Sequence, residues 1–306
     1  MRMVMIPFIL ILASALCVKG VINKTRARLA GRKGCRFFQP LLTVGVLLGK
    51  GEIYSTSSTW LTRVAPAVYL ASALVAALLL PLGVFPAVVS FDGDFILFAY
   101  LLAFGKLALV LAAMESGSSF QGMGSAREVL FSMLVEPCFF LLVGTLAMVT
   151  GCGSFSAIFA KFDNMSVNLL MLSLILAYGF LNVALVENGR VPVDDTRTHL
   201  ELTMVHEAMV LDLSGVDLAF VQMGSWLKLS IWGMLAVNAL IPARTTGWPL
   251  ILWFAAAMTA YGAVIGLIES LMARNRMTKN ATYLVTVSAI GLLGFTVAFV
   301  LMTSGL

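Results

Sequence analysis

The residues best suited to hold or pass a proton are concentrated in one polar segment of an otherwise apolar chain, residues 187–217. This segment contains both histidines of the chain, two arginines and a run of carboxylates. His199 and His206 share one face of any helix that spans both, and imidazole exchanges protons near neutral pH. They suit proton exchange, pH sensing or a structural pair. The carboxylates that could line an ion path here are Glu187, Asp194, Asp195, Glu201 and Glu207.

Some of these groups have a competing structural role. Thr198 and Glu201 fit a capping box, Thr-x-x-Glu, which predicts a helix beginning one residue after the threonine. Glu201 would then bind backbone N–H groups instead of protons, and both possibilities stay open. Arg190 lies close in sequence to Asp194 and Asp195. We expect its positive charge to lower the pKa of these carboxyl groups.

Charged residues also interrupt the apolar stretches of the chain. A charge inside a spanning helix costs about 2.5–3.5 kcal/mol on insertion scales, so such groups are usually paired, hydrated and functional. Lys106, Glu136 and Lys228 lie inside predicted spans. A lysine near the middle of a helix cannot extend to the interface, which indicates a polar interior. Carboxylates at predicted span ends, which water could simply solvate, are Glu115, Glu128, Glu187 and Glu269.

The composition is typical of an integral membrane protein. Hydrophobic residues make up 60% of the chain and charged residues 11%, with a mean hydropathy of +0.98. Apolar stretches recur along the whole sequence, which favours helices because backbone groups in lipid must pair within each segment. We predict an all-α protein of about eight transmembrane helices, a single polytopic membrane domain over residues 1–306. The predicted spans are 3–19, 65–90, 95–114, 129–150, 167–187, 216–241, 249–271 and 281–304.

Basic residues predict the orientation of the chain. Lysine and arginine are concentrated in loops 20–64 and 272–280. The positive-inside rule places these loops in the cytoplasm, with loops 115–128 and 188–215, and both termini outside. A basic loop beside a span contacts lipid headgroups, so no nucleic-acid partner is expected. Residues 37–50 are too short to span and predict an interfacial amphipathic helix, with a helix buried in the loop as the alternative.

The chain lacks the usual motifs for metals and nucleotides. None of its four cysteines forms a CxxC pair, which argues against an iron–sulfur cluster or a thiolate zinc site. His206-Glu207 begins like HExxH, but Val210 replaces the second histidine. Residues 122–124, Gly-Met-Gly, could cradle an anion, although a packed turn is the simpler interpretation. We therefore expect no metal site and no catalytic residue on this chain.

The 187–211 segment resembles the membrane subunit common to respiratory complex I and the group 4 membrane-bound nickel–iron hydrogenases. The sequence THLELTMVHEAMVL, residues 198–211, is similar to that of the formate hydrogenlyase and hydrogenase-4 branch, as are residues 117–128 and Glu136-Pro137. The basic first loop and Gln39-Pro40 resemble the amphipathic segment of the family. The matching residues in the segment are Glu187, Arg190-x-Pro192-x-Asp194, His199-Leu-Glu201-Leu and His206-Glu207-Ala208-Met209-Val210-Leu211.

The resemblance implies a membrane anchor without a redox centre, in the inner (cytoplasmic) membrane with its main polar loops in the cytoplasm. It implies partners: hydrogenase small and large subunits, a ferredoxin-like iron–sulfur subunit, and antiporter-like membrane subunits. The nickel–iron site and 4Fe-4S clusters would lie in those partners. Cys35, Val193 and the run 195–198 depart from the complex I pattern, which puts quinone binding in doubt and favours the hydrogenase interpretation.

We hypothesise that this subunit couples electron transfer in its partners to proton or sodium translocation. Arg127 and Arg190 would hold carboxylates ionised, and the two intramembrane lysines would pass charge onward. The alternatives are a quinone-site subunit of a complex I-like NADH-quinone oxidoreductase, a stand-alone ion-coupled transporter, and a purely structural anchor. The absence of an obvious internal repeat counts against the transporter. The expected ion path comprises Glu115, Glu136, Glu187, Asp194, Asp195, Glu201, Glu207, Lys106 and Lys228.

Overall fold

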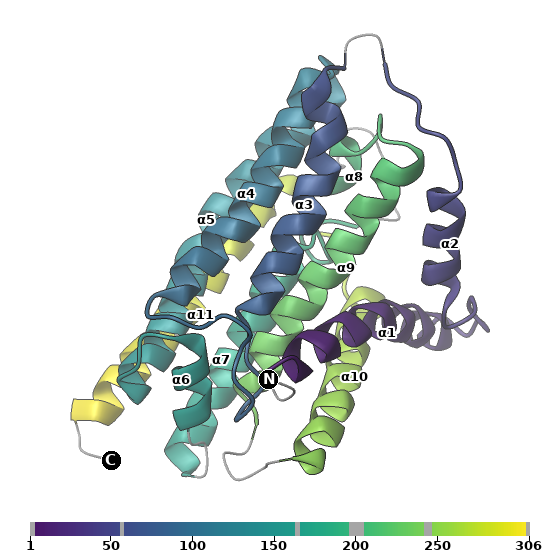
Figure 1. The fold of residues 1–306 in the computed structure, drawn as a ribbon. Coiled ribbons are helices and arrows are strands. Elements are labelled where there is room, and N and C mark those ends of the chain that lie inside the picture. The colour runs from purple at the N-terminus through teal and green to yellow at the C-terminus, as the bar shows by residue number, and fades with distance from the viewer. Residues whose placement is uncertain (1–3, 56–57, 163–165, 196–204, 242–246, 304–306) are drawn as a thin grey trace.

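The protein is a tilted bundle of long helices (Figure 1), described here from a computed structural model that covers residues 4–55, 58–162, 166–195, 205–241 and 247–303. Over these ranges the regular structure is helical, with one isolated β-bridge, which confirms the all-α prediction. The helices are α1 (Ile6–Leu29), α2 (Gln39–Leu48), α3 (Trp60–Leu78), α4 (Asp94–Glu115), α5 (Ser119–Thr150), α6 (Phe155–Lys161), α7 (Val167–Glu187), α8 (His206–Met209), α9 (Gly215–Asn238), α10 (Trp248–Leu271) and α11 (Met277–Thr303).

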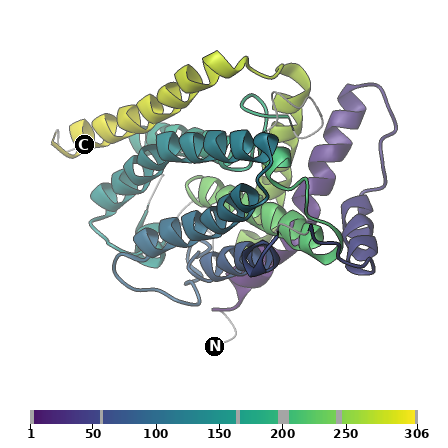
Figure 2. The same cartoon turned by 90° about the horizontal axis from the view of Figure 1, so that it is seen from above.

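Seven of the described helices are long and apolar enough to cross a membrane: α1, α3, α4, α5, α7, α10 and α11. Each matches a predicted span. The remaining predicted span, 216–241, corresponds to α9. This helix is less apolar than the seven, because Lys228 and several small or polar residues interrupt its apolar run. Protein covers this helix instead of lipid, since α9 packs on α1, α3 and α7. Seen from above, it lies inside the group of other helices (Figure 2).

Contacts between loops show that α9 extends through the same thickness as its neighbours. At one end of the bundle, the Tyr54 hydroxyl donates to Asp217 Oδ2 at 2.9 Å, at the start of α9. At the other end, Asn238 Nδ2 donates to the carbonyl of Pro81 at 2.7 Å, in the turn after α3. The predicted cytoplasmic loops therefore gather at one end, where Arg274 also contacts Asp194.

Several helix boundaries differ from the sequence-based spans: α1 extends to Leu29, ten residues beyond its predicted end, and α3 and α5 differ as well. α3 ends at Leu78, so Pro81 and Pro86, which fall inside the predicted span 65–90, lie after the helix. α5 begins at Ser119, so most of the Gly/Ser-rich stretch 115–128 is helical and the Gly122 N–H donates to Ser118 O at 3.0 Å. Gly124 packs against α8, where a Cβ would lie 2.9 Å from the Val205 carbonyl oxygen. Gly124 serves close helix packing and the Gly122 N–H is used within the helix, so the anion-cradle interpretation is wrong.

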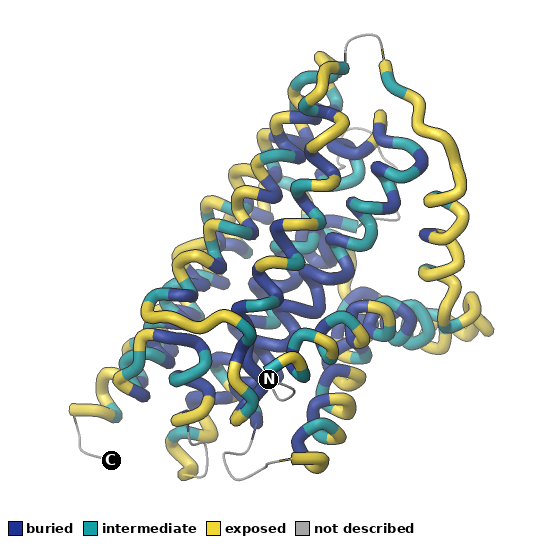
Figure 3. Tube along the Cα trace, in the orientation of Figure 1, coloured by how far each residue is buried: buried dark blue, intermediate teal, exposed yellow. Residues whose placement is uncertain are grey.

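α2 lies beside α9 and α1 with most of its surface exposed (Figure 3). Its single buried residue is Val44, whereas Leu41, Leu42, Val46 and Leu48 are exposed. An exposed apolar helix of this length, flanked by basic residues, fits the interfacial position that the sequence predicts rather than a buried loop helix.

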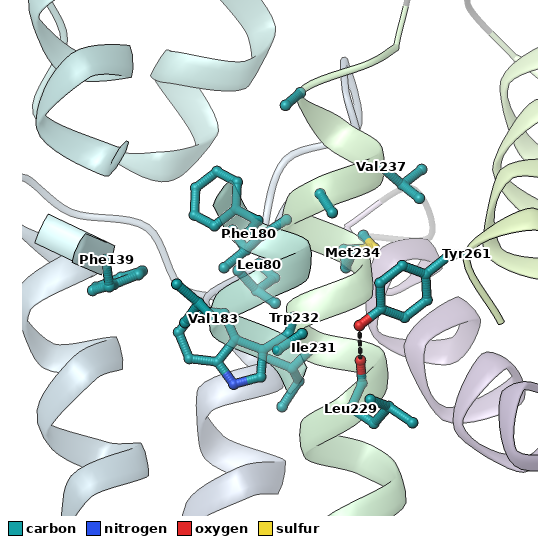
Figure 4. Close-up of a cluster of buried hydrophobic side chains, with 14 of the residues drawn as sticks. Leu80, Phe139, Phe180, Val183, Leu229, Ile231, Trp232, Met234, Val237 and Tyr261 are labelled. Carbon is teal, nitrogen blue, oxygen red and sulfur yellow. Dashed lines mark hydrogen bonds between the residues drawn. The ribbon is translucent and has the colours of Figure 1, made fainter. Parts of the chain in front are cut away.

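An aromatic core lies between α4, α5 and α9. Trp232 packs edge-to-face on Phe98 and Phe139, with ring centroids 5.9 and 5.4 Å apart. On the opposite side of α9, the Tyr261 hydroxyl donates to Leu229 O at 3.3 Å (Figure 4). Edge-to-face pairs of this kind favour one fixed arrangement of the helices. The core therefore holds α9 in place at Trp232, one helical turn from Lys228.

Candidate functional site

Four charged side chains from four helices meet inside the bundle. We call Lys106 (α4), Glu128 (α5), Glu187 (α7) and Lys228 (α9) the charge cluster. Lys106 Nζ lies 3.1 Å from Glu128 Oε1 and 3.0 Å from Glu187 Oε2. Lys228 Nζ lies 2.7 Å from the same Glu187 oxygen. Glu187 therefore bridges two lysines that are far apart in sequence.

The charge cluster is almost sealed from solvent and balanced in charge. The Lys228 side chain is 2% exposed and that of Glu187 is 12% exposed. Ser132 adds hydroxyl contacts, accepting from Lys106 Nζ and donating to Glu187 Oε1 at 3.2 Å. Two cations and two carboxylates satisfy one another, whereas loss of one partner leaves a buried charge uncompensated, at a cost of about 3–5 kcal/mol. Adding or removing one proton disturbs the same balance.

Helix packing positions the lysine of α9. Gly224 lies one turn before Lys228, and a Cβ there would be 2.6 Å from the Tyr69 ring of α3. The absence of a side chain lets α9 approach α3. Lys228 is further held by a hydrogen bond of 3.0 Å to the Glu187 carbonyl oxygen, at the last residue of α7. A free carbonyl at a helix C-terminus is a favourable partner for a cation.

Three cavities lie next to one another around the charge cluster. The central cavity, of about 10 Å³, is lined by all four charged residues of the cluster together with Tyr69, Asn188, His206 and Ser225. That volume is at the lower limit for a single water molecule, and the polar lining offers such a molecule several partners.

The second cavity, which we call the loop cavity, has a volume of about 280 Å³ and lies between α1, α2, α9 and the segment after α7. It shares Asn188, His206 and Ser225 with the central cavity. Lys19, Arg190 and Glu207 also line it. Its wall is about equally polar and apolar.

The third cavity, which we call the α4–α5 groove, has a volume of about 580 Å³ and is mostly apolar. It shares Lys106 and Glu187 with the central cavity, and Ser132 and Glu136 add polar groups to its wall. Neighbouring polar side chains therefore extend from the loop cavity, through the charge cluster, to the outer surface of α5. A proton needs such a series of titratable and hydroxyl groups in order to move through a protein.

Two further ion pairs organise the loop end of the bundle. Glu269 in α10 binds Arg26 of α1, and its Oε1 lies 2.7 Å from Arg190 Nη1. Asp194 Oδ1 lies 3.0 Å from Arg274 Nη2, in the α10–α11 connection. The expectation that Arg190 holds Asp194 is therefore wrong. The turn after α7, in which Arg190 O accepts from the N–H of Asp194, leaves the Arg190 side chain on α10.

Asp194 joins two loops. Its Oδ2 accepts from the backbone N–H of Val205 at 3.2 Å and of His206 at 3.4 Å. Burial raises the pKa of the Asp194 carboxyl group, and the adjacent Arg274 guanidinium opposes that shift. The aspartate thus connects α8 with the α10–α11 connection.

The remaining predicted site residues lie in several places. Glu115 is apart from the charge cluster, because its Oε1 caps α3 through the Thr59 N–H at 2.7 Å. Glu136 is exposed on α5, and Glu207 lines the loop cavity. Arg127 and Asp195 are partly buried and have interactions of their own. His199, Glu201 and the proposed cap Thr198 lie outside the described residues.

Sequence reasoning placed Glu128 and Glu269 only as solvated span ends and did not include them in the ion path. Glu128, Ser132 and Glu136 are spaced by four residues, which places them along one face of a helix. This spacing was the available signal for Glu128, but it depended on recognising that the helix begins before residue 129. No comparable local signal connects Glu269 with Arg26, because their pairing joins α1 to α10.

Comparisons with known proteins agree over nearly the whole chain. A family model described as NADH dehydrogenase matches residues 1–303. Hydrogenase-4 component C of Escherichia coli (strain K12) is 31% identical over 225 residues, which is 73% of this chain and 70% of that protein. Formate hydrogenlyase subunit 4 of the same organism is 27% identical over 282 residues, 89% of this chain and 90% of that protein.

The fold also matches a solved structure. A chain of the membrane-bound sulfane sulfur reductase, an archaeal respiratory membrane complex, superposes with a TM-score of 0.82 at 19% sequence identity. The match covers 97% of this chain and 98% of that chain. At this identity the likeness speaks for the fold alone.

Proposed function

Since the chain belongs to the NADH dehydrogenase family, we propose that it is the membrane subunit of a hydrogenase-type respiratory complex and couples electron transfer in its partners to ion movement. The two relatives named as hydrogenase-4 and formate hydrogenlyase components support the hydrogenase type. The peripheral partners would carry the nickel–iron site and the 4Fe-4S clusters, and antiporter-like subunits would lie beside this chain in the membrane. The complex lies in the inner (cytoplasmic) membrane with loops 20–64, 115–128, 188–215 and 272–280 in the cytoplasm.

The adjacency of the three cavities carries this proposal. His206 and Glu207, at the loop cavity, lie on the side where a peripheral arm docks. Shared lining residues connect that cavity with the charge cluster and with the α4–α5 groove. A structural anchor has no need for two lysines and two glutamates at the centre of this series, since burying them is costly.

The charge balance of the cluster suggests how a proton moves. A proton that enters through His206 neutralises Glu187, which leaves Lys106 and Lys228 with one carboxylate. Repulsion between the lysines then favours release of a proton from Lys106, through Ser132, towards Glu136. The neutral Lys106 then takes the proton from Glu187, and loss of the released proton to the next acceptor completes the return to the starting state. One proton enters and one leaves in each cycle.

Glu187→Gln tests this function in the assembled complex. We expect the substitution to abolish ion uptake into vesicles while hydrogen evolution with an artificial electron donor continues, because electron transfer takes place in the partners. Glu115→Gln is the matched control and should keep ion uptake, since Glu115 lies outside the cavity series. Equal uptake by the Glu187→Gln and unsubstituted complexes would sink the proposal.

A complex I-like quinone subunit is the second candidate, and the loop cavity is the observation that favours it. The cavity lies beside the interfacial helix α2 and has both polar and apolar walls, as a quinone headgroup site requires. The co-purifying partners distinguish the two functions. Nickel and hydrogenase subunits support the first proposal, whereas flavin and NADH-dependent reduction of quinone without nickel support the second.

A further inference from the structure

We propose that the α4–α5 groove is the docking site for a transmembrane helix of a partner subunit, and that this helix carries a basic side chain opposite Glu136. The inference deepens the proposed function by describing one partner, and it rests on that function only in placing the chain inside a membrane complex. Two independent observations support this docking site: the carboxylate of Glu136, unpaired among the described residues, and the shape of the groove.

Glu136 is a carboxylate at mid-helix without a partner. It is exposed, and within the described part of the chain it makes no ion pair and no hydrogen bond. It follows Glu128 by two helical turns, about 12 Å along the axis of α5. Glu128, by contrast, is paired with Lys106. A lone carboxylate on a lipid-facing surface at this depth is costly, so another molecule must supply its counter-charge.

The backbone next to Glu136 also lacks a donor. Pro137 has no N–H, so the Met133 carbonyl loses its usual helical partner four residues later. The Met133 side chain is 73% exposed, which places this turn on the outer surface of α5. An acceptor carbonyl and a carboxylate on the same surface both call for a donor, and a basic side chain can serve both.

The groove has the shape that a helix needs. α4 packs extensively on α3, and α5 on α11, whereas α4 and α5 contact each other less extensively and leave the groove between them. Exposed apolar residues line each side: Tyr100, Phe104 and Leu107 on α4, and Val129 and Met133 on α5. A groove lined in this way accepts the side chains of a third helix. Lipid tails could fill the same space but offer no positive charge, and lipid headgroups lie at the interface.

Site-specific photo-crosslinking in intact membranes tests the proposal. A photo-reactive amino acid in place of Phe104 probes the groove, and the same amino acid in place of Leu252, an exposed position on α10, is the matched control. We expect the Phe104 position to form one protein adduct, and its crosslinked peptide to lie in a spanning helix that contains lysine, arginine or histidine. Adducts with lipid alone, or with a helix that lacks a basic residue, overturn the proposal.

Charge reversal supplies the second test. Glu136→Lys should reduce the Phe104 adduct to background, and replacement of the partner's basic residue by glutamate should restore it. Restoration separates lost docking from misfolding of this chain. An adduct that survives Glu136→Lys overturns the proposal. The two proposals fail separately. If Glu136→Gln keeps full ion uptake and the adduct, the proton exit through Glu136 is contradicted. If uptake is lost and no protein adduct forms at Phe104, the docking is contradicted.

Discussion

At the scale of single residues, Glu187 has the most demanding position. It lies between two lysines, accepts a hydrogen bond from the Ser132 hydroxyl and is the last residue of a spanning helix. Its sequence neighbours give no hint of this, because both lysines come from other helices. Glu136 is the contrasting case, since it is a carboxylate on the proposed path with no partner in the described residues.

Loss of Lys228 should destabilise the chain. Lys228→Met leaves Glu187 with one cation in a nearly sealed site, and we expect a cost of about 3–5 kcal/mol. The double substitution Lys228→Met with Glu187→Gln should cost less than the sum of the two single substitutions, because it also removes the carboxylate. Thermal unfolding of the complex in detergent measures all three variants. Additive losses would show that the two side chains do not interact.

Asp194 should make stability depend on pH. Its pKa is raised chiefly by burial, so the folded chain binds this proton more tightly than the unfolded chain does. The contribution of Asp194 to stability is therefore full at acid pH and is lost as the pH rises through the raised pKa.

Asp194→Asn should flatten the acid-to-neutral part of the stability profile. The measurement is the unfolding midpoint in detergent across that pH range. Glu115→Gln is the control, because its carboxylate lies at the surface, and it should leave the Asp194-dependent slope in place. An unchanged slope in Asp194→Asn would mean that another group titrates.

At the scale of helices, close packing decides where the charges meet. α9 carries Lys228 and approaches α3 at Gly224, where the Tyr69 ring occupies the space of a side chain. The sequence pattern of α9 resembles a broken apolar span, yet the helix is the most enclosed part of the bundle. Its polar residues are tolerated because protein surrounds them.

Gly224→Val should force α9 away from α3. We expect an overpacking cost of about 1–3 kcal/mol and reduced ion uptake, since Lys228 would move relative to Glu187. Tyr69→Leu should partly restore both properties by opening space at the contact. Vesicle uptake and thermal unfolding report the two effects. If Gly224→Val behaves like the unsubstituted chain, this contact does not position the cluster.

At the scale of the whole molecule, ion pairs at the loop end connect segments that are remote in sequence. Glu269 joins α1, α10 and the turn after α7, while Asp194 joins α8 to the α10–α11 connection. These links shape the surface on which a peripheral arm would dock. They also connect that surface to the loop cavity, because Arg190 and His206 line its wall.

Arg274→Ala should therefore weaken docking of the peripheral arm more than insertion in the membrane. The substitution removes the counter-charge of Asp194 and leaves the α10–α11 connection held by the hydrogen bond from the Asn275 N–H to the Pro192 carbonyl oxygen. We expect the chain to accumulate in membranes while less hydrogenase activity co-purifies with it. The comparison variant is Arg276→Ala, because Arg276 lies two residues away and the ion pair with Asp194 is made by Arg274. Equal co-purification from both variants would contradict this role for Arg274.

Sequence alone was sufficient for the membrane class, the approximate helical spans and three of the charges within them, Lys106, Glu136 and Lys228. These properties follow from local composition, because a bilayer requires long apolar helices and makes each buried charge conspicuous. The family resemblance also rested on contiguous motifs, which the comparisons confirm.

Only the tertiary structure decided which charged residues pair and which of them is exposed at the surface. Arg190 binds Glu269 and not Asp194, and Glu187 bridges Lys106 and Lys228. These pairings depend on how α1, α4, α7, α9 and α10 pack, and ion pairs between helices leave no periodic trace in any one segment. The same holds for Glu136, whose exposure beside a groove depends on the separation of α4 from α5.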